Sequence, residues 1–252
     1  NWSRLAYVQV AVSISRGPWA IGLLRKGLKE PLPYTFQFML SKTLKESAGR
    51  ALEPLGKCIG KWGIKPNHIT IAGLVLTFYA AWFLYNNRDD EPDIYYAFLI
   101  GLIASLFDGA DGLVARSTGT SSIKGGYLDA IIDRYADCIA FGTLILSGWM
   151  KPIPIQGLDV ISGEMWAIAA LAGAFQTSYS RAAAERLGVS QESIGIIERP
   201  ERWFLLGMGL LIGEMLGDVE TIITWVVAFL AIFGNITVLQ RMYHFWTEAK
   251  DD

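Results

Sequence analysis

Residues 108–133 read DGADGLVARSTGTSSIKGGYLDAIID and join two long apolar segments, at about 94–114 and 128–149. Each segment has roughly the 20 residues that a helix needs to cross the hydrocarbon core of a bilayer. Four aspartates stand where the first segment ends and the second begins: Asp108, Asp111, Asp129 and Asp133. Because a charged side chain inside a membrane costs about 2.5–3.5 kcal/mol on insertion scales, these aspartates indicate a functional site.

Apolar segments dominate the chain from residue 68 onward. Apolar and aromatic residues make up 52% of the 252 residues and charged residues 18%, whereas soluble domains carry about 25% charge. We therefore predict an all-α, polytopic membrane protein. Its six transmembrane helices are expected at about 68–85, 94–114, 128–149, 165–184, 203–216 and 221–246.

Residues 1–62 contain many lysines and arginines and no apolar run long enough to span a bilayer. Between residues 36 and 62, apolar residues recur at three- and four-residue steps, with basic residues between them. This pattern predicts an interfacial amphipathic helix whose basic side faces anionic headgroups, and an ordinary surface helix is the alternative. We divide the chain into a cytoplasmic and juxtamembrane segment, 1–62, and a transmembrane domain, 63–252.

Loop charge predicts the orientation of the helices in the membrane. One set of loops is acidic or nearly uncharged, whereas the loops between them carry most of the remaining arginines and lysines. The positive-inside rule places the basic loops, both termini and the aspartates on the cytoplasmic side of the cell membrane. The formal net charge of −2 gives no sign of a nucleic-acid partner.

The spacing of the four aspartates suits a metal site. Asp108 and Asp111 are three residues apart and Asp129 and Asp133 four apart, so each pair shares one helix face. The loop between the two helices is short, which allows the faces to meet. Facing carboxylates repel unless cations lie between them, and hard oxygen ligands suit Mg²⁺ or Mn²⁺. Two such ions about 3.5–4 Å apart are an established arrangement for displacement at phosphorus. The alternative is that the aspartates are solvated loop residues.

The same stretch resembles the signature of the CDP-alcohol phosphotransferase family. That signature is D-x-x-D-G-x-x-A-R, eight residues, then G-x-x-x-D-x-x-x-D. The sequence matches it without a gap at Asp108, Asp111, Gly112, Ala115, Arg116, Gly125, Asp129 and Asp133. The resemblance extends over about residues 62–246 and does not include residues 1–50.

The resemblance implies a role for each matching aspartate. Asp108, Asp111 and Asp129 correspond to ligands of a first divalent cation, and Asp129 and Asp133 to ligands of a second. Asp133 also corresponds to the general base of the family. Asp137 lies outside the signature, one helical turn after Asp133, and is a candidate for a supporting role.

A second set of residues is expected at the CDP-linked lipid. The two glycines of this set remove side chains where a phosphate or ribose approaches the backbone, and the arginine offers a fork of donors to a phosphate. By resemblance, the expected contacts are Asn67, Thr70, Gly112, Arg116, Ser122 and Gly125. Pro66-Asn67 also fits a helix start in which Asn67 is the N-cap.

Four arginines are expected at the cytoplasmic ends of the last three helices: Arg181, Arg199, Arg202 and Arg241. Arginines beside a metal site suit a phosphate on the acceptor, although a topology signal or contact with anionic lipid would also explain them. Their surroundings resemble the archaetidylinositol phosphate and phosphatidylinositol phosphate synthase branch of the family, which uses inositol 1-phosphate. Tyr179 departs from that branch, which often has a basic residue there.

These observations predict an enzyme that moves a diradylglycerol phosphate group from a CDP-linked lipid to inositol 1-phosphate and releases CMP. Glycerol 3-phosphate is the alternative acceptor, since it is also phosphorylated. A divalent cation transporter is the alternative from another class, although transporter sites lie near the midplane, often at broken helices in two repeated halves. The resemblance also implies a homodimer.

Overall fold

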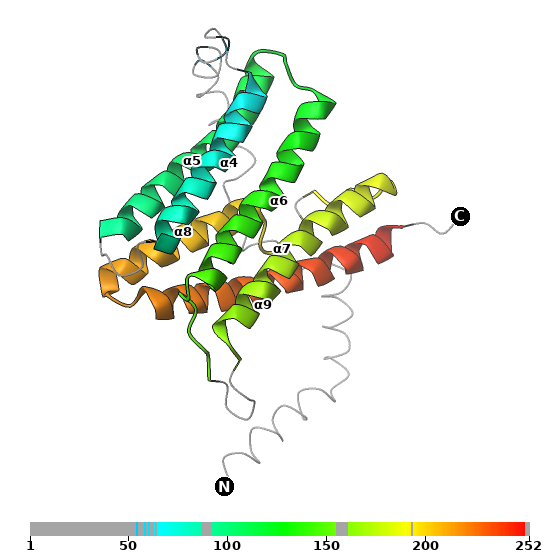
Figure 1. Ribbon diagram of the computed structural model, residues 1–252. Helices are drawn as coiled ribbons and strands as arrows, with labels where there is room; N and C mark the ends of the chain where they lie inside the picture. The colour runs from blue at the N-terminus through cyan, green and yellow to red at the C-terminus, as the bar shows by residue number, and fades with distance from the viewer. Residues whose placement is uncertain are drawn as a thin grey trace, which may run out of the picture. The chain divides into compact units, whose positions relative to one another are not determined.

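The computed structural model describes residues 65–86, 92–154, 161–192 and 194–249, together with Pro54, Cys58, Gly60 and Gly63. The predicted interfacial helix at 36–62 lies almost entirely outside the described residues. Over these ranges the chain forms six α-helices, shown in Figure 1: α4 Pro66–Asn86, α5 Pro92–Ser117, α6 Ile123–Leu146, α7 Gly163–Arg186, α8 Arg199–Leu216 and α9 Val219–Glu248.

The all-helical prediction is confirmed for the described part of the chain. One isolated bridge, between Ile153 and Ile161, is its only extended pairing. Each of the six helices covers one of the predicted apolar segments, although α6 ends at Leu146, three residues before the predicted end at 149. Among these helices, α4, the Ile94–Ser117 part of α5, and α9 are long and apolar enough to cross a membrane. Charged residues interrupt the apolar sequences of α6 and α8, and α7 is rich in alanine. Six membrane spans therefore remain a prediction.

The six helices pack as two groups of three that touch along their sides. Helix α4 contacts α5 and α6, α9 contacts α7 and α8, and the α5–α8 and α6–α7 contacts join the groups (Figure 1). Phe141 of α6 and Ile223 and Val227 of α9 are fully buried in the hydrophobic core. Because Ile223 and Val227 are four residues apart, they present one face of α9 to this core.

Local hydrogen bonds determine where α6 and α8 begin. The Ser122 hydroxyl caps α6 by accepting a hydrogen bond from the Gly125 N–H at 3.0 Å. At the start of α8, the Glu201 carboxylate accepts from the Glu198 N–H at 3.1 Å, as in a capping box. These caps fix the first turns of two helices whose side chains meet at the candidate site.

Helix α4 begins at Pro66, which tolerates the first helical position because its missing N–H would be unsatisfied there. Asn67 therefore lies inside the first turn, and the alternative that it is the N-cap is wrong. The Thr70 hydroxyl, one turn further on, reaches across to the carboxylate of Asp111 on α5.

The segment between α6 and α7 is tied to α9. The Lys151 N–H donates to the Thr224 hydroxyl at 2.9 Å, and the Lys151 ammonium lies 3.2 Å from both Asp218 and Glu220. Hydrogen bonds to Asp218 and Glu220 raise the pKa of Lys151.

Candidate active site

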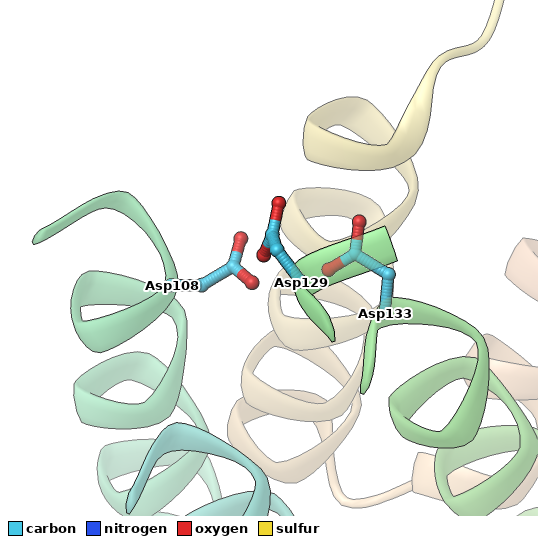
Figure 2. Close-up of side chains that lie close together, drawn as sticks. All are labelled: Asp108, Asp129 and Asp133. Carbon is cyan, nitrogen blue, oxygen red and sulfur yellow. The ribbon is translucent and has the colours of Figure 1, made fainter. Parts of the chain in front are cut away.

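Three of the four predicted carboxylates converge from two helices. Asp108 projects from α5 and Asp129 and Asp133 from successive turns of α6, and Figure 2 shows the three side chains pointing toward one another. One oxygen from each lies within 4.8 Å of the others, and all three residues are half-buried. The four-residue spacing of Asp129 and Asp133 thus places both carboxylates on one face of α6, opposite Asp108 of α5.

This cluster fits a divalent cation. Three half-buried carboxylates at such short range repel one another, and the effective dielectric constant of a protein interior increases the repulsion. The Oδ1 atom of Asp133 is buried, lies 3.0 Å from the NH1 of Arg199 and accepts no well-aligned hydrogen bond among the described groups. Only hard oxygen donors are offered by the cluster, which is the ligand type that Mg²⁺ and Mn²⁺ prefer.

Asp111, the fourth predicted ligand, lies beside the cluster and has different partners. The residue is 6% exposed, and its carboxylate accepts hydrogen bonds from the Thr70 hydroxyl and the Gly112 N–H. Buried carboxylates need such donors to offset the loss of water. The sequence could not show this, because Thr70 is 41 residues away along the chain.

A cavity of about 610 Å³ adjoins the carboxylates, within the size range of small-molecule sites. Its lining includes Asp111 and Asp129. All six residues that the sequence predicts at the CDP-linked lipid also line it: Asn67, Thr70, Gly112, Arg116, Ser122 and Gly125. The structure therefore brings together residues from α4, from α5 and from the start of α6.

Two of the cavity glycines stand where a larger residue would crowd polar groups. A Cβ on Gly125 would lie 3.1 Å from the Ser122 Oγ and 3.3 Å from the Asn67 Oδ1. On Gly112, a Cβ would lie 3.2 Å from a terminal nitrogen of Arg116. Glycine at these positions lets the polar side chains approach the backbone closely, as recognition of a phosphate or ribose requires.

The four predicted arginines have different surroundings. Among the contacts of the described residues, Arg199 is the one of the four that pairs with predicted cation ligands. Its NH1 atom lies 2.7 Å from the Asp108 Oδ2 and 3.0 Å from the Asp133 Oδ1. On the next turn of α8, Arg202 pairs with Asp137 at 2.6 Å, and their side chains are 6% and 4% exposed.

Arg241 and Arg181 complete this set. The Arg241 side chain is 3% exposed and donates to the carbonyls of Thr177 at 2.5 Å and Ile194 at 2.8 Å. Arg181 is exposed on α7 and forms an ion pair at 2.8 Å with Glu185, one turn away on the same helix. Arg202 and Arg241 thus hold helices and loops together, whereas Arg181 and Arg199 keep part of their surface exposed.

The partner of Asp137 could not be predicted from the sequence. Asp137 accepts hydrogen bonds from Arg202 and from the Trp203 indole, the latter at 3.2 Å. The available signal was spacing: Asp137 is four residues after Asp133, and Arg202 is three after Arg199. Two ion pairs therefore lie one turn apart between α6 and α8.

The fold and the site define a helical membrane protein with a carboxylate cluster suited to divalent cations, next to a polar cavity. Residues 64–234 match the sequence model of the CDP-alcohol phosphatidyltransferases, and the chain belongs to this family. The archaetidylinositol phosphate synthase of Pyrococcus horikoshii is 31% identical over 84% of this chain and 97% of its own. The phosphatidylinositol phosphate synthase of Mycobacteroides abscessus is 28% identical over 79% of this chain and 85% of its own.

Solved structures show the same fold. The phosphatidylinositol phosphate synthase of Mycobacterium tuberculosis with CDP-DAG bound is 24% identical, with a TM-score of 0.66, over 81% of this chain and 99% of that one. Its complex with manganese and citrate has a TM-score of 0.65 at 24% identity, over 79% of this chain and 92% of that one.

Proposed function

We propose that this enzyme transfers a diradylglycerol phosphate group from a CDP-linked lipid to inositol 1-phosphate and releases CMP. The observation that carries the proposal is the convergence of Asp108, Asp129 and Asp133 beside the 610 Å³ cavity. Membership of the CDP-alcohol phosphatidyltransferase family and relatives named as inositol phosphate lipid synthases support the donor and the acceptor. A transporter reading is not favoured by these findings.

The cavity is the proposed site for the cytidine and diphosphate of the donor. Asn67, Thr70, Gly112, Arg116, Ser122 and Gly125 would contact them, since all six line it. Asp108, Asp129 and Asp133, with Asp111 beside them, would hold two divalent cations, Mg²⁺ or Mn²⁺. When bound, the cations supply positive charge that neutralises the diphosphate and the departing CMP.

Asp133 is the proposed general base. Its buried Oδ1 lies 3.0 Å from the NH1 of Arg199 and accepts no well-aligned hydrogen bond among the described groups, and in this proposal it accepts the proton of the acceptor hydroxyl. The acceptor oxygen then forms a bond to the β-phosphorus, which carries the lipid, and the bond from that phosphorus to the CMP oxygen breaks. Because a carboxylate is a weak base, close positioning of the hydroxyl must contribute much of the rate.

An apolar groove on α4 offers a place for the lipid chains. It has a volume of about 540 Å³ and is lined by His68, Ile71, Ala72, Val75, Leu76 and Phe107. Thr70 of the cavity and Ile71 of the groove are neighbours in α4, so one helix borders both. We propose that the tails lie along this groove and reach it from the bilayer, while the acceptor approaches from the cytoplasm.

Arg199 is the proposed direct contact for the acceptor phosphate, since it borders the carboxylates and is partly exposed. Arg181 is a proposed second contact. Arg202 and Arg241 would act by holding α8 and the loop before it, because their donors serve Asp137 and backbone carbonyls. We further propose six membrane spans for the catalytic domain, 63–252, with both termini in the cytoplasm, an interfacial helix before it, and a homodimer.

The test is an acceptor panel with the purified full-length chain in detergent. CMP release from CDP-diacylglycerol and from a CDP-linked archaeal diether is measured with inositol 1-phosphate, free inositol, glycerol 3-phosphate and serine, with and without Mn²⁺. Manganese-dependent CMP release with inositol 1-phosphate is the expected result. Release with glycerol 3-phosphate alone would change the acceptor, and no metal-dependent release with any acceptor would favour the transporter.

A further inference from the structure

Arg199 contacts two carboxylates that belong to different helices. Its NH1 atom lies 2.7 Å from Asp108 of α5 and 3.0 Å from Asp133 of α6, both proposed cation ligands. Arg134 also approaches Asp133, at 3.4 Å, but the same nitrogen donates at 2.7 Å to the Ala130 carbonyl of its own helix. Among the ion pairs of the described residues, Arg199 is therefore the side chain that bridges α5 and α6.

This bridge leaves part of the guanidinium group unused. The Nε atom of Arg199 is buried and has no hydrogen-bond partner among the described groups. The guanidinium carbon lies 5.8 Å from the Trp203 ring centroid, a cation–π distance. A guanidinium offers five N–H donors and can bind a phosphate through two of them at once. The bridge to the carboxylates uses only one of its nitrogens.

Hydrogen bonds hold the start of α8 in place around Arg199. If Arg199 changes its partner, the movement must therefore come from its side chain. Arg202 and Trp203, one turn further along α8, both donate to the buried Asp137 of α6. The Glu198 N–H is held by Glu201 at the start of the same helix. The flexible stem of Arg199 is the part of this region that can move its charge between two sites.

We propose that Arg199 is a counter-ion that neutralises Asp108 and Asp133 until a divalent cation binds, and that cation binding releases its guanidinium to receive the acceptor phosphate. A divalent cation and a guanidinium cannot share the same two carboxylates without strong repulsion. A phosphate is likewise repelled by the carboxylates while Arg199 lies against them. This inference rests on the proposed function, because it uses the same cation ligands and a phosphorylated acceptor.

Two opposite effects on cation affinity follow. Without acceptor, Arg199 competes with the cation, so its removal strengthens cation binding. With a phosphate present, Arg199 gains a partner as it leaves the carboxylates, so phosphate strengthens cation binding. By thermodynamic reciprocity, the cation strengthens phosphate binding by the same factor.

The test is a Mn²⁺ titration of the full-length chain in detergent without CDP-linked lipid, with unbound Mn²⁺ measured by electron paramagnetic resonance. Arg199→Gln is compared with the wild type and with Arg186→Gln, which removes an exposed charge from the end of α7. We expect Arg199→Gln to bind Mn²⁺ about tenfold more tightly, within the usual range of coupling between sites. Arg186→Gln is expected to change the affinity by less than about twofold. Equal or weaker Mn²⁺ binding by Arg199→Gln overturns the proposal.

A second series repeats the titration with inorganic phosphate, inositol 1-phosphate or glycerol 3-phosphate, corrected for Mn²⁺–phosphate complexes in buffer alone. At least one of them should strengthen Mn²⁺ binding by the wild type and lose this effect in Arg199→Gln. If none does, the proposal is wrong. Coupling with glycerol 3-phosphate but not inositol 1-phosphate would overturn the proposed acceptor and leave the role of Arg199 standing.

Folding of each variant is checked by gel filtration and thermal unfolding. Arg199→Lys serves if Arg199→Gln does not fold, because it keeps the charge but not the fork of donors. It is expected to retain competition with Mn²⁺ and to lose most of the phosphate effect. Retention of the full phosphate effect by Arg199→Lys would contradict the assigned role of the guanidinium.

Discussion

Removal of the Asp137 charge is expected to destabilise the protein strongly. Asp137 and Arg202 lie 2.6 Å apart, with side chains 4% and 6% exposed, and the Trp203 indole donates to the same carboxylate. Asp137→Asn leaves the guanidinium of Arg202 buried without a counter-charge. Breaking a buried ion pair from one side costs about 3–5 kcal/mol.

The expected shift in melting temperature follows from this free energy. For chains of about 150–250 residues, 1 kcal/mol moves the melting temperature by about 2–4 °C, so Asp137→Asn should lower it by roughly 6–20 °C. The assay is thermal unfolding of purified protein in one detergent, followed by circular dichroism. Asp137→Asn, Arg202→Met and the double variant form a double-mutant cycle.

The double variant distinguishes a specific ion pair from a general loss of packing. Because removal of both charges leaves neither group unpaired, the double variant should recover most of the stability that Asp137→Asn loses. Lys151→Met, at an exposed ion pair, is the matched control and should shift the melting temperature little. If Asp137→Asn melts with the wild type, or if the two single losses simply add, the reasoning about this pair fails.

Three further predictions concern the site. Chelation with EDTA should abolish CMP release, and Mn²⁺ should restore it, because the cations held by Asp108, Asp129 and Asp133 would neutralise the diphosphate and the departing CMP; CMP release by the chelated enzyme would contradict the proposed role of the cations. Asp133→Asn should lower kcat by about 10²–10⁴-fold, the usual contribution of a general base, which a single-turnover assay measures. Gly125→Ala should raise the KM for the CDP-linked lipid more than it lowers kcat, since the new Cβ would crowd Asn67 and Ser122; an unchanged KM would remove that position from the donor site.

The helices and the meeting of the carboxylates could be predicted because they depend on local patterns. Apolar segments define the six helices, and the four-residue spacing of Asp129 and Asp133 places their carboxylates on one face of α6. The carboxylates could be expected to meet because the connection between α5 and α6 is short. Predicting these features requires only residues that lie close together in the sequence.

The partners of individual side chains depend on the packing of distant helices and could not be predicted. Arg199 and Arg202 are both arginines at the start of α8, yet one faces the carboxylate cluster and the other is buried against Asp137. The three-residue spacing of these two arginines does not predict which neighbouring helix each of them contacts. Asp111 likewise accepts a hydrogen bond from Thr70 of α4, a contact that no local sequence pattern predicts.

The charges of α6 also bear on how the chain enters the membrane during synthesis. As one of the six proposed spans, α6 carries Asp137, and the arginine that pairs with it follows 65 residues later on α8. The ribosome synthesises α6 before α8. Until α8 has been made, Asp137 therefore lies in the translocon or at the bilayer surface without its counter-charge. Chains truncated before residue 199 should accordingly show incomplete insertion of α6 in a glycosylation-tagging assay, and stable insertion should coincide with the synthesis of α8.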